Sequence, residues 1–254
     1  MEWTLRFLGT GAAHAVELGS ASAVIERDGR PLLLIDCGPD ALDRYRETYG
    51  ESPRALYLTH IHMDHVAGME RLFFQTWFGA GADRRGEVKL FTHAALVPWL
   101  QSRIADYPGV LAEGGVNYWD AFRLTPCSRG FWLEGQWFEV FATRHHRPGT
   151  SFGLRLPGSL VFTGDTRPIP EQLALYADTG EPVAHDCGRL GNPSHTGLDD
   201  LAREYPPALR QRLWLYHYGS AADGRAMSAE GYRVAAPGEV FALASPLSGE
   251  ENAG

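Results

Sequence analysis

Cysteine, positive charge and long apolar runs are all scarce in this chain of 254 residues. Cysteine occurs only at Cys37, Cys127 and Cys187, a spacing that builds neither a zinc knuckle nor a disulfide framework, so we expect a reduced, cytoplasmic setting. No run approaches the roughly 18 consecutive apolar residues of a membrane span, and the first residues lack the pattern of a signal peptide. We therefore expect no membrane partner.

The charge balance limits the class of substrate. Lys and Arg number 23 against 31 Asp and Glu, which gives a formal net charge of −8. Phosphate-rich polymers bind through clustered Lys and Arg, so long nucleic acid is not an expected partner. Bound divalent cations would reverse the sign of the field locally, and a small anionic substrate is therefore compatible with the composition.

The length and the apolar content predict a single domain. A hydrophobic fraction of 44% is sufficient for a sizeable core. We expect one domain over residues 1–254, built from two layered halves at about 1–118 and 119–254. A homodimer is left open, because nothing in the sequence decides the oligomeric state.

The most informative stretch follows the apolar run Ala55–Leu58, which predicts a buried strand. The next residues include His60, His62, Asp64 and His65. Imidazole nitrogens and carboxylate oxygens on a loop leaving a strand are able to ligate two neighbouring cations. A zinc-type ion takes about four ligands, so further ligands are expected downstream. A polar turn that holds three histidines by chance is the weaker interpretation, because exposed turns favour Gly, Asn, Asp and Ser.

Several later strand-like runs also end on polar residues. Leu160–Thr163 leads to Asp165, Leu213–Tyr216 leads to His217, and Trp137–Ala142 leads to the neighbours His145 and His146. Neighbours on an extended chain point to opposite faces. Only one of these two histidines is therefore expected to be a ligand.

In this order the residues resemble the metallo-β-lactamase superfamily, whose signature is H-x-H-x-D-H. The resemblance covers nearly the whole chain and extends to Leu8–Gly11, Leu34–Gly38, Thr163–Thr166 and Leu215–His217. It is greatest for the phosphodiesterase branches, ribonuclease Z and the cyclic-phosphate phosphodiesterases. It implies an α/β fold, a four-layer αβ/βα sandwich of two mixed sheets with helices on the outer faces.

The resemblance also implies a binuclear metal centre. Its ligands would be His60, His62 and His146 on one ion and Asp64, His65 and His217 on the other, with Asp165 bridging. His146 is favoured over His145 because H-x-P-G before a strand is the more familiar spacing. Asp36 would orient a ligating histidine. Zinc suits these donors best, with manganese or iron as alternatives.

The implied reaction is hydrolysis of a small or cyclic phosphodiester by metal-bound hydroxide. Asp64 and His195 would be the catalytic residues, with His195 protonating the leaving oxygen from a segment expected to open a helix. The family's H-S-T reads His195-Thr196-Gly197 here. His14 is expected at the rim of the pocket, and His185 is a weak candidate for supporting a ligand.

Two other reactions of the same fold are open to comparison. A thioester, lactone or amide hydrolase is the alternative, in which the same hydroxide attacks a carbonyl carbon. Redox di-iron enzymes of this fold are disfavoured by His62, because they usually place glutamate there. Within the phosphodiesterase branch, the chain shows neither the protruding arm and basic surface of ribonuclease Z nor the cysteine-rich insert of the cyclic-phosphate enzymes.

Overall fold

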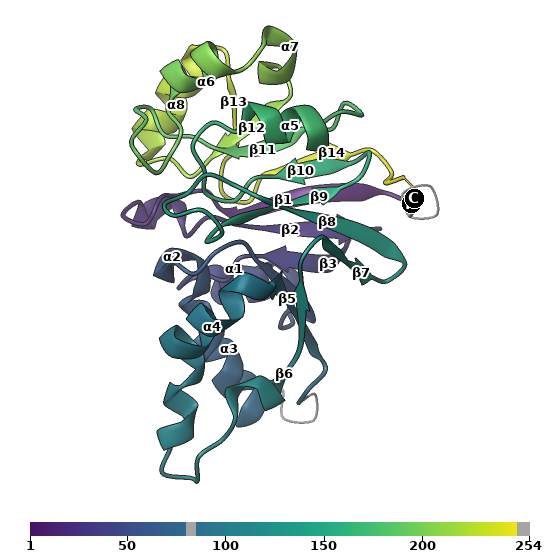
Figure 1. The fold of residues 1–254 in the computed structure, drawn as a ribbon, viewed down its shortest axis with the longest axis vertical. Coiled ribbons are helices and arrows are strands. Elements are labelled where there is room, and N and C mark those ends of the chain that lie inside the picture. Colours follow the sequence, from purple (N-terminus) through teal and green to yellow (C-terminus); the bar gives the residue numbers. More distant parts are fainter. Residues whose placement is uncertain (80–84, 248–254) are drawn as a thin grey trace.

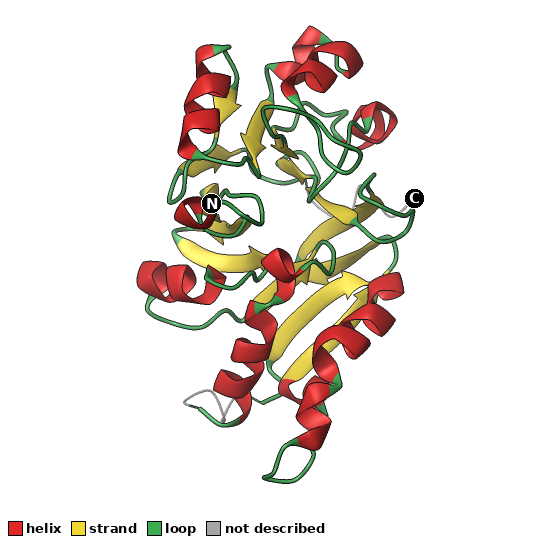
Figure 2. Ribbon diagram, turned by 90° about the vertical axis from the view of Figure 1, so that its left-hand side faces the viewer, coloured by secondary structure: helices red, strands yellow, loops and turns green. Residues whose placement is uncertain are grey.

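Two β-sheets are stacked between two layers of helices in the computed structural model, which describes residues 1–79 and 85–247 (Figure 1). Figure 2 shows the same arrangement from the side, with the helices in red and the strands in yellow. The predicted four-layer α/β sandwich of the metallo-β-lactamase type is thereby confirmed.

The first sheet contains seven strands in the order β14–β1–β2–β3–β4–β5–β6. Their bounds are β1 Trp3–Gly9, β2 Ser22–Arg27, β3 Arg30–Ile35, β4 Ala55–Leu58, β5 Val88–His93, β6 Phe122–Cys127 and β14 Val240–Leu243. The pairs among β14, β1, β2 and β3 are antiparallel, and those from β3 to β6 are parallel. Asp28 and Gly29 join β2 to β3 with φ of 52° and 70°, as a type I′ hairpin turn requires.

The second sheet repeats this plan with the order β13–β12–β11–β10–β9–β8–β7. Its strands are β7 Gly130–Leu133, β8 Gln136–Ala142, β9 Phe152–Leu156, β10 Leu160–Phe162, β11 Val183–Asp186, β12 Leu213–Tyr216 and β13 Arg233–Val234. The pairs from β7 to β10 are antiparallel, and those from β10 to β13 are parallel. Parallel strands therefore end near one another in both sheets.

Helices form the outer layers. They are α1 Ala41–Tyr49, α2 Met63–Val66, α3 Gly68–Trp77, α4 Val97–Leu100, α5 Pro170–Tyr176, α6 Leu198–Glu204, α7 Pro207–Arg210 and α8 Ala221–Ala229. In α3 the buried residues Met69, Leu72 and Phe73 recur at three- and four-residue spacing, which gives the helix one apolar face. Gly50 ends α1 with a left-handed φ of 71°.

Three apolar clusters fill the spaces between the layers. The central cluster joins both sheets, as at Phe7 and Phe162, whose ring centroids are 6.5 Å apart. A second cluster packs the first sheet against α1 and α3, with Phe73 fully buried. A third packs the second sheet against the helices α5, α6 and α8 through residues such as Leu173 and Leu201. The loops that leave the parallel strands emerge at the edge of this core.

Two expectations about the chain's course differ from the structure. The halves 1–118 and 119–254 do not coincide with the sheets, because β6 and β14 both lie in the first sheet. The segment around His195 does not open a helix, because α6 begins at Leu198, where Asp200 Oδ2 accepts the Gly197 N–H at 2.9 Å. In the described part of the chain, no helix has the length and apolarity needed to cross a membrane.

Candidate metal centre

The loop after β4 carries the histidine motif into the space between the sheets. Thr59, His60 and His65 are buried, and His62 directly precedes the short helix α2. The Nε2 atom of His60 lies 3.2 Å from Nδ1 of His62. Because β4 is buried along its whole length, the end of this strand is held firmly and the loop starts from a fixed position.

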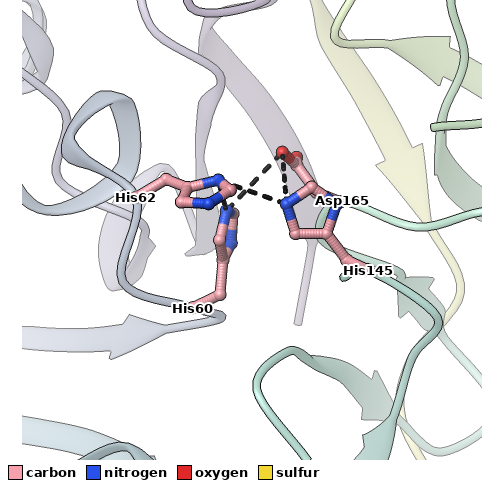
Figure 3. A group of neighbouring side chains, drawn as sticks. All are labelled: His60, His62, His145 and Asp165. Atoms are coloured by element: carbon pink, nitrogen blue, oxygen red, sulfur yellow. Dashed lines mark hydrogen bonds and ion pairs between the residues drawn. The ribbon is translucent and has the colours of Figure 1, made fainter. Parts of the chain in front are cut away.

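A first group of donors consists of His60, His62, His145 and Asp165 (Figure 3). His145 Nε2 lies 3.1 Å from His62 Nδ1, and Asp165 Oδ2 lies 3.6 Å from His60 Nε2. Two nitrogens bound tetrahedrally to one zinc at the usual bond length are about 3.3 Å apart. The imidazole spacing therefore suits a shared cation.

Burial keeps these three imidazoles in the form that binds metals. It is the largest influence on each ring, and it lowers the pKa of His60 and His62 and brings that of His145 to about 4. The neutral imidazole has a free lone pair on one nitrogen, which is the ligating form. The first group is therefore able to accept a cation without releasing protons from its rings near neutral pH.

A second group consists of Asp64, His65, Asp165 and His217. Asp165 Oδ2 lies 3.4 Å from His65 Nε2 and 3.3 Å from His217 Nε2. Asp64 Oδ2 lies 3.4 Å and 3.6 Å from the same two nitrogens. Asp165 thus belongs to both groups, as expected of a bridging carboxylate.

Unpartnered buried atoms in this second group indicate that it is suited to bind cations. His65 Nε2, His217 Nε2 and Asp165 Oδ1 are buried and have no hydrogen-bond partner among the described residues. Buried polar atoms are nearly always satisfied in folded proteins, and an unsatisfied cluster requires an explanation such as a bound ion. The donors at both groups therefore fit divalent metal ions.

Asp36 holds the ring of His65, as the sequence predicts. Its Oδ2 accepts a 2.8 Å hydrogen bond from His65 Nδ1, and Thr59 donates to both carboxylate oxygens at 2.8 Å. With Nδ1 engaged, Nε2 is the atom turned to Asp64 and Asp165. Burial disfavours a charged imidazole, but Asp165 and Asp36 outweigh it and raise the pKa of His65 well above its usual value. A divalent cation would take the place of that proton.

The prediction of His146 as a ligand needs correction. His145 is 2% exposed and belongs to the first group, whereas His146 is exposed and lies outside it. His146 has a left-handed φ of 54°, which turns the chain away, and its Nδ1 lies 3.0 Å from Ser194 Oγ. In the structure, Phe141, Thr143 and His145 point inward in alternation along the chain leaving β8, which places His145 and not His146 among the donors.

Asp186 is a site residue that the sequence reasoning missed. It ends β11, and its Oδ2 accepts hydrogen bonds from His195 Nδ1 and from the Thr166 N–H, both at 2.8 Å. Its Oδ1 lies 3.4 Å from His217 Nδ1. One carboxylate therefore orients both the predicted proton donor and a predicted ligand. Its position at the end of a buried β-strand is the signal that could have marked it.

His195 lies beside the second group. Its ring stacks on that of His217 with centroids 4.9 Å apart, and its side chain is 24% exposed. Burial lowers the tendency of this ring to be charged, but the carboxylate of Asp186 outweighs it and raises the pKa of His195. The shift favours the protonated form of the ring, which is the form that an acid needs.

His14 and His185 have different surroundings. His14 is exposed and lines the cavity, as expected. His185 is buried, with Nδ1 2.6 Å from the Asp186 carbonyl oxygen and Nε2 2.7 Å from Tyr205 Oη. It is therefore a packed core histidine that ties β11 to α6.

A cavity of about 820 Å³ opens onto these groups. Its walls come from Ala12–His14, the loop Gly188–Asn192, and Gly219 with Asp223. The turn at Gly9–Gly11 places the first wall, since a Cβ on Gly9 would lie 2.3 Å from the Ser20 carbonyl oxygen. The Thr10 carbonyl also accepts the His217 N–H at 2.7 Å. The glycine turn thus fixes the backbone of a metal-facing histidine.

Comparison with known structures agrees with the fold. A diphosphatase from the PhnP family superposes with a TM-score of 0.73 at 19% identity, covering 97% of this chain and 99% of that one. The metallo-β-lactamase fold protein YhfI from Bacillus subtilis superposes with a TM-score of 0.72 at 15% identity, covering 95% of this chain and all of that one.

Sequence relatives are more specific. The family described as Anti-Pycsar protein Apyc1 matches residues 3–241. Proteins of that name are 33% identical over 223 residues in Saccharibacillus brassicae, covering 84% of this chain and 89% of the relative, and 28% identical over 229 residues in Paenibacillus harenae, covering 86% and 91%. The chain therefore belongs to the Anti-Pycsar protein Apyc1 family and is a phosphodiesterase-like hydrolase with the metallo-β-lactamase fold.

Proposed function

We propose that this protein is a binuclear metal-dependent phosphodiesterase, with zinc as its resident ion, that hydrolyses a small or cyclic phosphodiester. The observation that carries the proposal is the position of Asp165. Its Oδ2 lies 3.6 Å from His60 Nε2 and 3.3 Å from His217 Nε2, so one carboxylate serves both donor groups. Membership of the Apyc1 family and the fold shared with a diphosphatase favour phosphorus over carbonyl chemistry.

The chain's residues divide into two sets of ligands. His60, His62 and His145 would hold one ion, and Asp64, His65 and His217 the other, with Asp165 shared. When bound, two divalent ions supply an activated water and neutralise charge on the phosphoryl oxygens. Asp36 and Asp186 keep the ligating rings in their orientations.

His195 supplies the proton for the leaving oxygen. Its Nδ1–H is engaged by Asp186 at 2.8 Å, so the proton on Nε2 is the one that remains for transfer. General acid catalysis of this kind contributes roughly 10²–10⁴ in rate. An alkoxide leaving group needs that proton, because it is a strong base.

The cavity suits a small anionic substrate. Its volume is about 820 Å³, and among the described residues that form its walls Arg189 is the one Lys or Arg. The net charge of −8 opposes long polyanions. We propose a cyclic mononucleotide as the first biological substrate to test. A cytoplasmic location suits the three cysteines, which are free and buried.

The test is turnover by the purified protein on a panel of substrates, with and without chelator. The panel contains purine and pyrimidine cyclic mononucleotides, bis-nitrophenyl phosphate, a thioester and a lactone. We expect cleavage of phosphodiesters only, loss of activity with chelator, and recovery on adding zinc, with manganese and iron compared. Cleavage of only the carbonyl substrates would overturn the phosphodiesterase proposal in favour of a thioester or lactone hydrolase.

A further inference from the structure

The loop between β11 and α6, residues 188–197, is closed tightly at its base. The Gly188 N–H donates to the Thr196 carbonyl at 2.9 Å, and Thr196 Oγ1 donates to the Thr166 carbonyl at 2.8 Å. A Cβ on Gly197 would lie 2.0 Å from the backbone nitrogen of Gly191. The two ends of the loop are therefore fixed, and its tip is held by its own hydrogen bonds.

One side-chain oxygen organises that tip. Oδ1 of Asn192 accepts the N–H of Ser194 at 2.8 Å and the N–H of His195 at 3.0 Å. The Asn192 N–H in turn donates to the His195 carbonyl at 3.0 Å. This is an Asx turn, in which an asparagine side chain replaces a backbone acceptor. Pro193, inside the turn, has its φ fixed by its ring.

The turn reaches the metal centre at two points. The Ser194 carbonyl accepts a hydrogen bond from His145 Nδ1 at 2.9 Å, which leaves Nε2 of that ring directed at His62 and Asp165. The next residue, His195, reaches Asp186 at 2.8 Å on the other side. The backbone of two consecutive residues therefore places a predicted ligand and the predicted proton donor.

We propose that Asn192 is a positioning residue for both His145 and His195, acting through the backbone of Ser194 and His195. The inference rests on the proposed function for its catalytic meaning. In structural terms, Oδ1 of Asn192 sets the position of the Ser194 carbonyl. That carbonyl in turn sets the tautomer and the orientation of the His145 ring.

Loss of the Asn192 oxygen should affect the two metal positions unequally. Removing the Asn192 oxygen leaves the Ser194 N–H without its partner and leaves the His195 N–H only its 3.4 Å contact with the Asn192 backbone carbonyl, which lets the Ser194 carbonyl shift. Loss of the partner that orients a ligating histidine typically lowers metal affinity about 10–100-fold. The ion held by His60, His62 and His145 is expected to weaken more than the other, because the Ser194 carbonyl contacts His145 directly. The turn meets the second group only through the ring of His195, which stacks on His217.

The experiment compares Asn192→Ala, Asn192→Asp and the unsubstituted protein. Asn117→Ala is the matched control, since Asn117 Oδ1 accepts the Trp119 N–H at 3.2 Å in a similar turn that is not part of the metal centre. Zinc retained per chain is measured by equilibrium dialysis against a chelator series. Steady-state kcat and KM are measured on a cyclic mononucleotide. The His145 Nδ1–H is followed by proton–nitrogen NMR of the imidazole ring.

We expect Asn192→Ala to hold one of two zinc ions about 10–100-fold more weakly, with a fall in kcat larger than any change in KM. The Nδ1–H of His145 should exchange faster with water. Asn192→Asp should restore all three readouts, because its carboxylate oxygen accepts the same two N–H groups. Asn117→Ala should match the unsubstituted protein.

The inference is overturned if Asn192→Ala retains zinc, kcat and the His145 signal unchanged, or if Asn192→Asp fails to rescue while remaining folded. Failure of the proposed function gives a different result. In that case the unsubstituted protein binds fewer than two zinc ions or leaves the phosphodiesters intact, and the NMR readout alone then decides the role of Asn192.

Discussion

The carboxylate of Asp186 accepts a 2.8 Å hydrogen bond from Nδ1 of His195. The same carboxylate lies 3.4 Å from Nδ1 of His217, so the predicted proton donor and a predicted ligand share one support. The two rings stack at 4.9 Å. Substitutions at His195 and at the metal donors around it separate the effect on proton transfer from the effect on metal binding.

His195→Ala, compared on two leaving groups, tests whether His195 donates a proton to the leaving oxygen. We expect kcat to fall about 10²–10⁴-fold on a cyclic mononucleotide, whose leaving alkoxide needs a proton. On bis-nitrophenyl phosphate the loss should be below about tenfold, because nitrophenolate leaves without protonation. Zinc content should stay at the value of the unsubstituted protein. Equal losses on both substrates would contradict the assigned role.

Asp165→Asn tests the shared carboxylate. The amide retains the size of the side chain but removes the charge that serves both donor groups. We expect zinc content to fall at both positions and turnover to decrease by at least about 10²-fold. Metal analysis after gel filtration, with circular dichroism as a check on folding, gives the answer. Retention of two ions and full turnover would remove Asp165 from the centre.

The neighbours His145 and His146 should respond oppositely to alanine substitution. His145→Ala removes a buried ring 3.1 Å from His62, so we expect loss of one zinc ion per chain and a fall in kcat of more than about tenfold. His146→Ala removes an exposed ring outside the donor group, so zinc content should remain unchanged. The reverse pattern would restore His146 as the ligand.

The pair formed by Arg155 and Glu181 predicts how stability depends on pH. Arg155 reaches Glu181 at 2.6 Å, and the Glu181 side chain is fully buried. Burial alone would raise the pKa of Glu181, but hydrogen bonds from Thr179, from Arg155 and from the Gly158 N–H outweigh it and lower the pKa below the ordinary value of 4.5. The stabilisation is therefore complete above pH 4.5 and is lost as the pH falls through the lower, folded-state pKa.

Denaturant unfolding at pH 7 and at lower pH tests this pair. Leaving a buried charge without a partner costs about 3–5 kcal/mol, but Arg155 also pairs with Glu139 at 3.0 Å and with Asp178 at 2.7 Å. Glu181→Gln should therefore destabilise the protein at pH 7 by less than this and show a smaller further loss in acid. Asp43→Asn is the control, because its pair with Arg71 is exposed and should contribute at most about 1 kcal/mol. Similar effects of the two substitutions would show that burial does not distinguish these pairs.

Much of the site could be predicted because its residues follow buried strands. The apolar runs before His60, Asp165 and His217 mark β4, β10 and β12, and parallel strands deliver their ends to the same edge. Asp36 was predictable for the same reason. The fold class followed from these strand ends together with the resemblance to a known superfamily.

The remaining features depend on backbone conformation that residue types do not determine. Choosing between His145 and His146 required the left-handed φ of 54° at His146, a conformation for which the sequence gives no glycine. To recognise the role of Asp186, one needs the parallel register of β11 beside β12, which pairs Asp186 with Tyr216. The halves were misplaced because β14 pairs with β1, a contact between opposite ends of the chain.

That last pairing affects how the protein is made. β1 leaves the ribosome before its partner β14, which is made more than two hundred residues later. Until then, one edge of β1 presents unpaired N–H and C=O groups to any neighbouring chain. All the predicted metal donors precede β14, so these donors are made while the first sheet still lacks an edge strand.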